Sequence, residues 1–398
     1  MGNLFKIAIR NLLRYKRRTL LTASLITIGV VFVLAFVSIS GSFKNMMIGQ
    51  ITDSMIGHLQ VHRKGFVASI ETLPLNLNLK GDAIARLEKI LSEQPEIEAY
   101  SPRVKLGGMF SNFTETSSIR LTAIYPEKEF KTVPLLPGRV IEGAKDLKPG
   151  GILVPELLAR GMKIKPGDAV VIVATNADGS VNGKQFVVTG MLESATGPGG
   201  RDGYIHMDDA RELLRMEGQQ VSEYAVRLKA FGKLAAFGKK LDGLLAKELN
   251  QQGKPIFELH TWEKLSPFFT ISRMIDVMTF FIKLMLIAIV LISIMNVMIM
   301  SVYERIREIG TIAAIGTLPG KILSMFVIEG FCMGVGGALI GDIVGISLVY
   351  LINLFKITYD FGQQKGYILQ AAVSPTDILV VSATVIIVSV IASLQPAF

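Results

Sequence analysis

The chain has little cysteine, histidine and tryptophan: one, four and one, respectively, in 398 residues. A single cysteine excludes a disulfide within the chain, so the fold depends on core burial rather than on covalent cross-links. There is no His-Glu-x-x-His helix and no Gly-x-Ser-x-Gly elbow, the sequence signs of a zinc protease and a serine hydrolase. His58 and His62 share one strand face with Gln60, but no third ligand is evident, so we favour solvated histidines over a zinc site.

The sequence also lacks a phosphate-binding loop. Gly316 to Lys321 places a lysine after a glycine, but its spacing and the following Ile322 do not fit a Walker A motif, and Gly197–Gly200 is not followed by Lys-Ser/Thr. No nucleic-acid recognition motif accompanies the net charge of +9. We therefore expect no catalytic residue, no metal, no directly bound cofactor and no nucleic-acid partner. If ATP drives this protein, another chain binds the ATP.

Charged residues are scarce in four apolar stretches, each with about the 17 to 25 residues that cross a hydrocarbon core. The stretches are Thr19 to Ile39, Met278 to Met300, Ile322 to Leu351 and Ile378 to Leu394. They predict a membrane α-helical protein with a large α+β extracytoplasmic domain. Its expected parts are a lead-in at 1–18, spans at 19–40, 274–302, 321–352 and 377–398, the domain at 41–273, a cytoplasmic segment at 303–320 and an external loop at 353–376.

Basic residues predict the orientation, because they are retained on the cytoplasmic side of a membrane. Five lie just before the first span: Arg10, Arg14, Lys16, Arg17 and Arg18. Two more, Arg305 and Arg307, lie between the second and third spans. Both groups place the N- and C-termini inside and the large domain outside. A cleaved signal peptide is the alternative, but the apolar run is too long and Ser38 to Gly41 is a poor cleavage site.

The large domain is predicted to combine two βαβ units with a β-rich insert at about 118–215. The first unit is a strand at Ile56 to His62, a helix at Asp82 to Ser92 and a strand at Ile97 to Val104. The second repeats this order with a strand at Glu223 to Leu228, a helix at Ala230 to Leu249 and a strand at Pro255 to His260. Between them, short apolar strands alternate with turns, at Ser118 to Tyr125, Gly151 to Pro155, Asp168 to Ala174, Gln185 to Leu192 and Gly203 to Met207. Together they predict a split βαβ body with a β-rich insert.

The cytoplasmic segment combines charges and glycines. Glu304 and Glu308 are four residues apart and share one helical face, as Arg305 and Ile309 do. Gly310 and Gly316 permit close approach or a bend. On pattern alone, a solvated interfacial loop explains this segment as well as a partner-binding helix does.

The same segment carries a resemblance to a known family. Glu304 to Gly310 reads Glu-Arg-x-Arg-Glu-Ile-Gly, between a span ending at Asn296 to Ser301 and a glycine-rich span with Glu329-Gly330 near its start. This resembles the permeases of the MacB, FtsX and lipoprotein-releasing type, the type VII ABC transporters. Further similar parts are Asn11 to Thr19, Gly151 to Pro155, Gly167-Asp168, Trp262-Glu263 and Gln395 to Phe398.

The resemblance implies a permease half that pairs with a second copy or a paralogue and binds a separate ABC ATPase homodimer. The external domain would comprise the family's Porter-like body and Sabre-like insert, and ATP would act only through the ATPase, by mechanotransmission. A periplasmic chaperone or adaptor and membrane lipid are further expected partners. The protein itself is expected in the cell inner membrane. The expected ATPase-coupling residues are Tyr303, Glu304, Arg305, Arg307, Glu308, Ile309, Gly310 and Gly316.

The third span also has a glycine stripe that predicts close helix packing. Its members are Gly330, Gly334, Gly337, Gly341 and Gly345.

From the resemblance and the predicted topology, we expect that this protein releases lipoproteins from the inner membrane. The alternatives are MacB-like export of peptides or drugs with a periplasmic adaptor, and FtsX-like signalling to a cell-wall hydrolase. A secondary transporter is disfavoured, because four spans lack the inverted repeats of that class.

Overall fold

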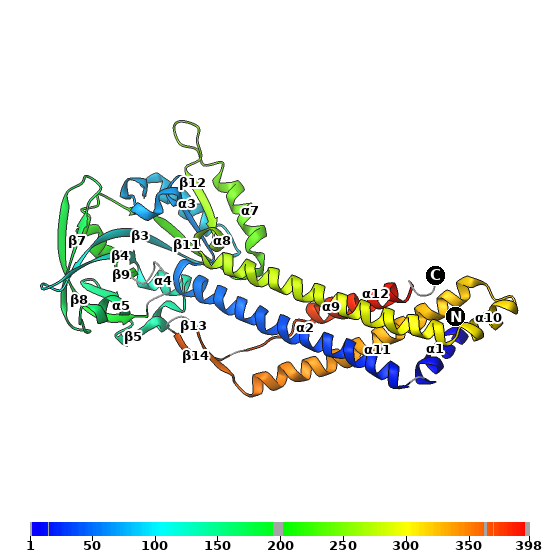
Figure 1. The fold of residues 1–398 in the computed structure, drawn as a ribbon. Coiled ribbons are helices and arrows are strands. Elements are labelled where there is room, and N and C mark those ends of the chain that lie inside the picture. The colour runs from blue at the N-terminus through cyan, green and yellow to red at the C-terminus, as the bar shows by residue number, and fades with distance from the viewer. Residues whose placement is uncertain (1, 15, 194–201, 362–363, 369, 395–398) are drawn as a thin grey trace. The chain divides into compact units, whose positions relative to one another are not determined.

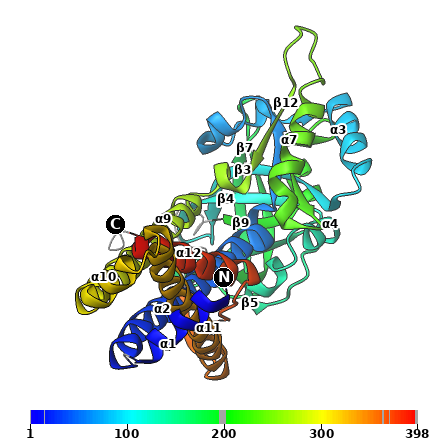
Figure 2. The ribbon, with the colours of Figure 1, turned by 90° about the vertical axis from the view of Figure 1, so that its right-hand side faces the viewer.

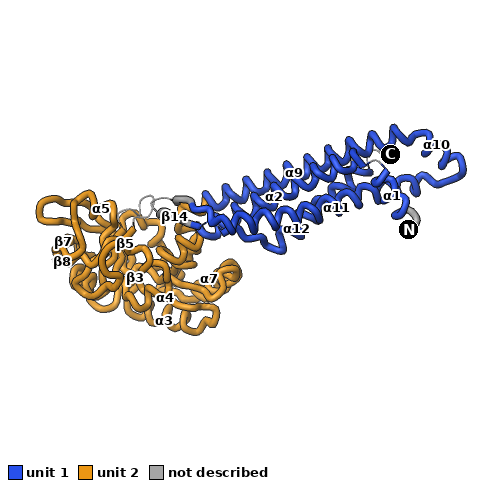
Figure 3. The backbone as a smooth tube through the Cα atoms, turned by 90° about the horizontal axis from the view of Figure 1, so that it is seen from below, with its two compact units in different colours: residues 1–46, 271–359, 366–398 blue, residues 47–270, 360–365 orange. Residues whose placement is uncertain are grey.

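The computed structural model describes residues 2–14, 16–193, 202–361, 364–368 and 370–394. Internal contacts divide the chain into two compact units (Figure 3). The helical unit comprises residues 1–46, 271–359 and 366–398, and the α/β unit comprises residues 47–270 and 360–365. The Gly197–Gly200 loop and the terminal Gln395 to Phe398, both considered above, lie outside the described residues.

Four long helices dominate the helical unit. Among the described residues, four helices are long and apolar enough to cross a membrane, by length and composition. They are α2 (Lys16–Ile51), α9 (Phe268–Glu304), α11 (Pro319–Leu354) and α12 (Pro375–Leu394), as Figures 1 and 2 show. The shorter elements are α1 (Gly2–Arg14), α10 (Ile306–Ala314) and a hairpin of β13 (Thr358–Phe361) and β14 (Gln364–Ile368). The prediction of four membrane-length helices is confirmed.

Two of these helices extend well beyond the predicted spans. α2 continues past residue 40 to Ile51 and leads into a π-helical turn, η1 (Thr52–Ile56). α9 begins at Phe268, before the predicted start at 274. The helices are longer than the predicted spans because apolar length marks only the part suited to hydrocarbon, whereas backbone hydrogen bonding continues along the helix.

The helical unit has its own core and an apolar outer surface. Ile26, Val30 and Leu34 of α2 pack in one cluster with Val290 and Ile294 of α9 and with residues of α11 and α12. Many other large apolar side chains of the same helices are exposed, among them Leu20, Phe32, Phe280, Met285, Ile343, Leu351, Leu379 and Ile387. An apolar surface of this extent suits contact with lipid or with another membrane protein.

The α/β unit contains the predicted split βαβ body. Its first βαβ unit is β1 (Leu59–Arg63), α3 (Asp82–Ser92) and β3 (Ile97–Ser111), and its second is β11 (Glu223–Leu228), α7 (Leu234–Leu245) and β12 (Phe257–Thr261). The strands lie in the order β12-β1-β11-β3, so a strand of each unit separates the two strands of the other. All three neighbouring pairs are antiparallel.

The core of this body lies between the sheet and its two helices. Leu87 of α3 and Leu241 of α7 belong to the same buried cluster as Val61 of β1 and Val226 of β11. Alternate residues of a strand point to opposite faces, and every third or fourth residue of a helix shares a face. The two helices therefore cover the same face of the sheet, which is the geometry that the apolar spacing predicts.

The insert continues the sheet of the body instead of forming a separate one. β3 pairs with β11 through Arg103, and from Val104 onward it pairs with β4. The insert strands are β4 (Thr116–Ile124), β5 (Val140–Gly143), β6 (Gly151–Pro155), β7 (Ala169–Thr175), β8 (Val181–Leu192) and β9 (Asp202–His206). Two small strands, β2 (Leu79–Lys80) and β10 (Gln220–Val221), pair with each other.

The sequence did not predict the helices of the insert. They are α4 (Pro126–Thr132), α5 (Glu156–Gly161) and α6 (Met207–Leu213), and a further short helix, α8 (Trp262–Leu265), follows β12. Each has about two turns or fewer, so its apolar residues do not repeat often enough to distinguish a helix from a turn. The β-rich character of the insert is confirmed, but it is not purely β.

Candidate functional site

The segment predicted to couple to an ATPase forms a compact corner in the helical unit. α9 ends at Glu304, Arg305 is non-helical with φ −108° and ψ 12°, and α10 starts at Ile306. After α10 the chain turns through Gly316, whose φ of +94° is in the left-handed region that glycine adopts without steric cost. We call residues 303–318, from the last two residues of α9 to the residue before α11, the tip.

The tip exposes an unusual number of apolar side chains. Tyr303 is 70% and Ile315 is 80% exposed, and Ile306, Ile312 and Leu318 are exposed as well. Exposed charges lie among them, at Glu304, Arg307 and Glu308. Glu308 also lies 3.7 Å from Arg14 of α1, in an exposed ion pair. An apolar patch with a charged rim is the usual composition of a protein-binding surface.

Arg305 points away from this surface. It is only 4% exposed, and its Nη1 lies 3.0 Å from Oε1 of Glu329 in α11. Asn11 of α1 donates a hydrogen bond to the same oxygen at 2.8 Å. The structure thus places Arg305 inside the helical unit, whereas Tyr303, Glu304, Arg307, Glu308, Gly310 and Gly316 are exposed and Ile309 is half-buried.

The glycine stripe of α11 meets two different helices. A Cβ atom on Gly337 would lie 2.6 Å from Ile26 of α2, and one on Gly341 would lie 2.7 Å from Val30. Gly345 is also close to α2, at 3.1 Å from Leu34. Gly330 and Gly334 instead approach α12, where a Cβ would lie 2.6 Å from Ser393 and 2.5 Å from Ser389, respectively. These distances leave no room for a larger side chain at four of the five positions.

Asn11 and Glu329 were not among the predicted site residues. Glu329 is a carboxylate in an apolar span and is 1% exposed, and such groups in membrane helices mark functional positions. That signal was available in the sequence. Nothing local indicated its partners, because Asn11 lies 318 residues away and Arg305 lies 24 residues away.

A buried charge network lies where the insert joins the body. Arg103 of β3 is bound to Glu129 of α4 at 2.6 Å and to Glu223 of β11 at 3.0 Å, and all three side chains are fully buried. Lys105 approaches Glu223 at 3.8 Å. Burial alone would raise the pKa of Glu223, but Lys105, His62 and Arg103 outweigh it and hold that pKa well below its usual range. Glu223 is therefore ionised.

The two strand histidines are buried, so the expectation that they are solvated is wrong. His58 is 4% and His62 is 0% exposed, and each packs against an aromatic ring. His58 lies edge-on to Phe231, and His62 stacks on Phe66. Within the part of the chain that the structure describes, no group of three or more His, Cys, Asp or Glu residues could hold a metal ion.

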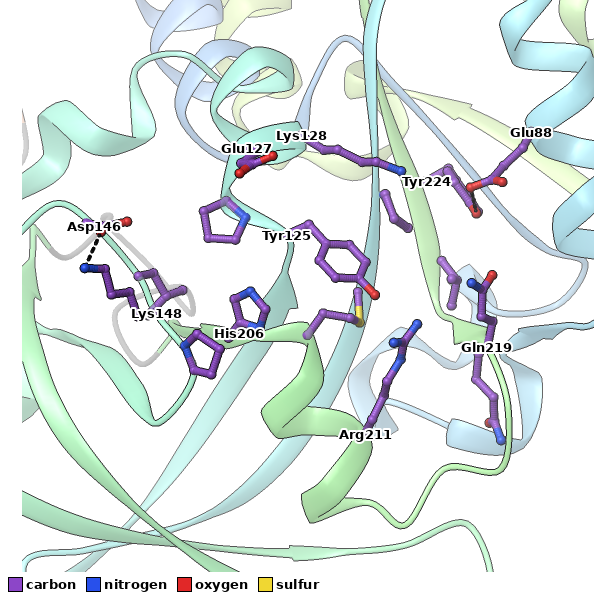
Figure 4. A pocket seen from close by; sticks show the side chains of 17 residues that line it. Glu88, Tyr125, Glu127, Lys128, Asp146, Lys148, His206, Arg211, Gln219 and Tyr224 are labelled. Atoms are coloured by element: carbon purple, nitrogen blue, oxygen red, sulfur yellow. Dashed lines mark hydrogen bonds and ion pairs between the residues drawn. The ribbon is translucent and has the colours of Figure 1, made fainter.

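The α/β unit also has a pocket of about 690 Å³ (Figure 4). Tyr125 lies beside it, with His206 edge-on at 5.9 Å between ring centroids and the Arg211 guanidinium 5.7 Å from the Tyr125 ring. The Tyr224 hydroxyl donates a hydrogen bond to Glu88 at 2.9 Å. Burial, aided by Glu88, raises the pKa of Tyr224 above its usual range, so this phenol stays neutral. The pocket thus offers neutral phenols and charges of both signs.

Two family models match this chain. The MacB-like periplasmic core domain matches residues 19–244, more than half of the chain, and the FtsX-like permease C-terminal domain matches residues 280–398. The chain is an ABC transporter permease of the MacB/FtsX family. The resemblance seen in the sequence is confirmed, and so is the fold class of four membrane helices with a MacB-like α/β domain.

Individual relatives include lipoprotein-releasing and macrolide-export proteins. The lipoprotein-releasing system transmembrane protein LolC of Xylella fastidiosa is 24% identical over 295 residues, which are 70% of this chain and 69% of that protein. The macrolide export ATP-binding/permease protein MacB of Acinetobacter baylyi is also 24% identical, over 89% of this chain but 52% of MacB. The permease therefore spans about half the length of that MacB.

Among solved structures, the periplasmic region of MacB from Actinobacillus actinomycetemcomitans matches 55% of this chain and 92% of its own. The identity is 17% and the TM-score 0.37. The extracellular domain of the transporter YknZ from Gram-positive bacteria matches 51% of this chain, with 14% identity and a TM-score of 0.36.

Proposed function

We propose that this permease is the membrane subunit of a lipoprotein-releasing ABC transporter and that its tip binds the ATPase. The proposal that the tip binds the ATPase rests on the surface of the tip, where apolar side chains such as Tyr303 and Ile315 are exposed beside charges. The sequence has no Walker A motif, so an ATP-driven permease of this kind needs a nucleotide-binding partner. Pairing with a second permease copy or a paralogue, and with an ATPase homodimer, completes the proposed assembly.

The substrate proposal rests on the relatives of the lipoprotein-releasing system. The LolC of Xylella fastidiosa and that of Neisseria meningitidis match 70% and 83% of this chain, respectively. Export of the macrolide type is the second candidate, supported by a MacB match over 385 residues. In either case a periplasmic chaperone or adaptor is a proposed partner of the α/β unit.

The proposed orientation follows the basic residues. Arg10, Lys16 and Arg17 precede or begin α2, and Arg307 is on the tip. This distribution supports an inner-membrane protein with cytoplasmic termini, a cytoplasmic segment at 303–320 that contains the tip, and periplasmic segments at 41–273 and 353–376.

Substitution of the tip tests this proposal. The permease is co-expressed with its ATPase, purified and reconstituted with a triacylated lipoprotein, and both ATP turnover and release of the lipoprotein to the aqueous phase are measured. Ile315→Glu should lower ATPase binding about 30-fold or more, because loss of an interface anchor typically costs about 2 kcal/mol or more. Without the ATPase, the permease should hydrolyse no ATP.

The matched control is Leu249→Glu. Leu249 is an exposed apolar residue of the α/β unit, 47% exposed, so the same change there should leave ATPase binding and turnover as in the unmodified protein. ATPase binding that survives Ile315→Glu would reject the tip as the docking site. Macrolide efflux without lipoprotein release would reject the substrate and favour the second candidate.

A further inference from the structure

Three segments far apart in the sequence meet at one carboxylate oxygen. Oε1 of Glu329 in α11 accepts a hydrogen bond from Nδ2 of Asn11 in α1 at 2.8 Å and one from Nη1 of Arg305 at 3.0 Å. Glu329 is 1% and Arg305 is 4% exposed, so this contact is shielded from water. Residues 11, 305 and 329 all belong to the helical unit.

Arg305 lies at the break between α9 and α10. It is the one non-helical residue between α9 and α10, with φ −108° and ψ 12°. A break of this kind is a natural hinge, because a few residues at the ends of elements absorb the dihedral change when rigid parts move. The guanidinium of Arg305 fixes that hinge to α11, since a buried charge does not give up its partner readily.

The acceptor lies on a tightly packed part of α11. The next residue, Gly330, faces α12 so closely that a Cβ would lie 2.6 Å from Ser393. Phe326, one turn earlier, is 2% exposed. A displacement that reaches Glu329 therefore acts on a helix that is packed against α12 and bound to α1, so the helix moves as a body.

We propose that Arg305, Glu329 and Asn11 form a positioning cluster that locks the α9–α10 corner to α11 and α1. With the lock in place, movement of the tip is passed to α11 instead of being absorbed by the hinge at Arg305. The inference rests on the proposed function, because it assumes that an ATPase moves the tip. It assigns to these residues transmission of that movement, not ATPase binding.

The test compares charge-breaking and charge-free variants in the reconstituted permease–ATPase complex. Arg305→Met removes the cation bound to a buried carboxylate, and Glu329→Met removes the carboxylate bound to a buried guanidinium, so each should also lower thermal stability. The double variant Arg305→Met/Glu329→Met has no unpaired charge and should recover stability. Because Arg305 is buried and does not reach the exposed surface of the tip, all three should bind the ATPase normally, yet lose at least 10-fold of the lipoprotein stimulation of ATP turnover, measured as the ratio to each variant's own basal turnover.

The conservative variant and a control separate coupling from folding. Arg305→Lys retains a cation that reaches the carboxylate and should restore most of the stimulation. Lys44→Met removes another ion pair of the helical unit, the 2.6 Å contact with Asp276 between α2 and α9, and should leave the stimulation unchanged.

The double variant decides the outcome. Normal stimulation in Arg305→Met/Glu329→Met would show a merely structural ion pair and overturn the proposal, even if the single variants fail to assemble. Stimulation that stays low in this stable variant supports it. If erythromycin but not lipoprotein stimulates ATP turnover of the unmodified complex, the proposed substrate is contradicted. The stimulation of the same variants is then measured with erythromycin in place of lipoprotein.

Discussion

Arg103 is a full charge in the interior of the α/β unit. It is 1% exposed and joins three elements, β3, α4 and β11, through Glu129 and Glu223. Lys105, 3.8 Å from Glu223, supplies a second cation, so Arg103 and Lys105 match the two carboxylates in charge, and His62 also lies 3.6 Å from Glu223. A charge-matched, hydrogen-bonded network is tolerated in a core, but each member then depends on the others.

Removing Arg103 should therefore destabilise the α/β unit strongly. Arg103→Met leaves Glu129 and Glu223 buried without their main partner, and breaking a buried pair in this way typically costs about 3–5 kcal/mol of unfolding free energy. The measurement is denaturant unfolding in detergent, followed by fluorescence. The chain's single tryptophan, Trp262, is 4% exposed in the core of the body, so its emission reports on this unit alone.

The matched control is Arg120→Met. Arg120 also forms an ion pair, at 2.8 Å with Glu71, but that pair is exposed and should be worth no more than about 1 kcal/mol. Equal unfolding midpoints for the two variants would mean that the buried network adds nothing to stability.

At the scale of elements, the sequence predicted what depends on local periodicity. α3 at Asp82–Ser92 and β11 at Glu223–Leu228 have the predicted bounds, because their apolar spacing is regular and turns flank them. The long strand β3 was predicted only to Val104, although it runs to Ser111. Its second half pairs with β4 and β7, and pairing with other strands cannot be inferred from the spacing of apolar residues within the strand itself.

The packing of the α11 glycines predicts opposite effects of alanine at two neighbouring positions. A Cβ on Gly337 would lie 2.6 Å from Ile26, so Gly337→Ala should cost about 1–3 kcal/mol through overpacking. Its neighbour Gly336 has no atom within 4 Å of the same position, so Gly336→Ala should be neutral or stabilising by up to about 1 kcal/mol. Thermal unfolding of the two variants in detergent, followed by size-exclusion chromatography, measures the difference.

A double variant identifies the contact responsible. Ile26→Ala removes the atoms that a Cβ on Gly337 would meet, so in that background Gly337→Ala should lose most of its penalty. A penalty that stays the same would place the clash elsewhere than at α2.

At the scale of the whole molecule, the candidate site was only partly predictable. The charges and glycines of residues 303–316 are contiguous in sequence, so the tip could be proposed from pattern and resemblance. The inward direction of Arg305 could not, because it depends on a break in the helix at that residue and on Glu329 in another helix. The fold of each unit was thus readable, whereas the contact between α1, α9, α10 and α11 required the structure.

Topology is the prediction on which the ATPase-binding proposal depends, because the tip can meet an ATPase only in the cytoplasm. Replacing Cys332 by alanine gives a chain without cysteine, since it is the only one. Gln251→Cys and Ala314→Cys then each add one thiol at an exposed position, the first in the α/β unit and the second on the tip. In intact spheroplasts without the ATPase, a membrane-impermeant maleimide should label Cys at 251 but reach position 314 only after the membrane is opened. Labelling of position 314 from outside would invert the orientation, and the tip could then not be the ATPase-binding surface.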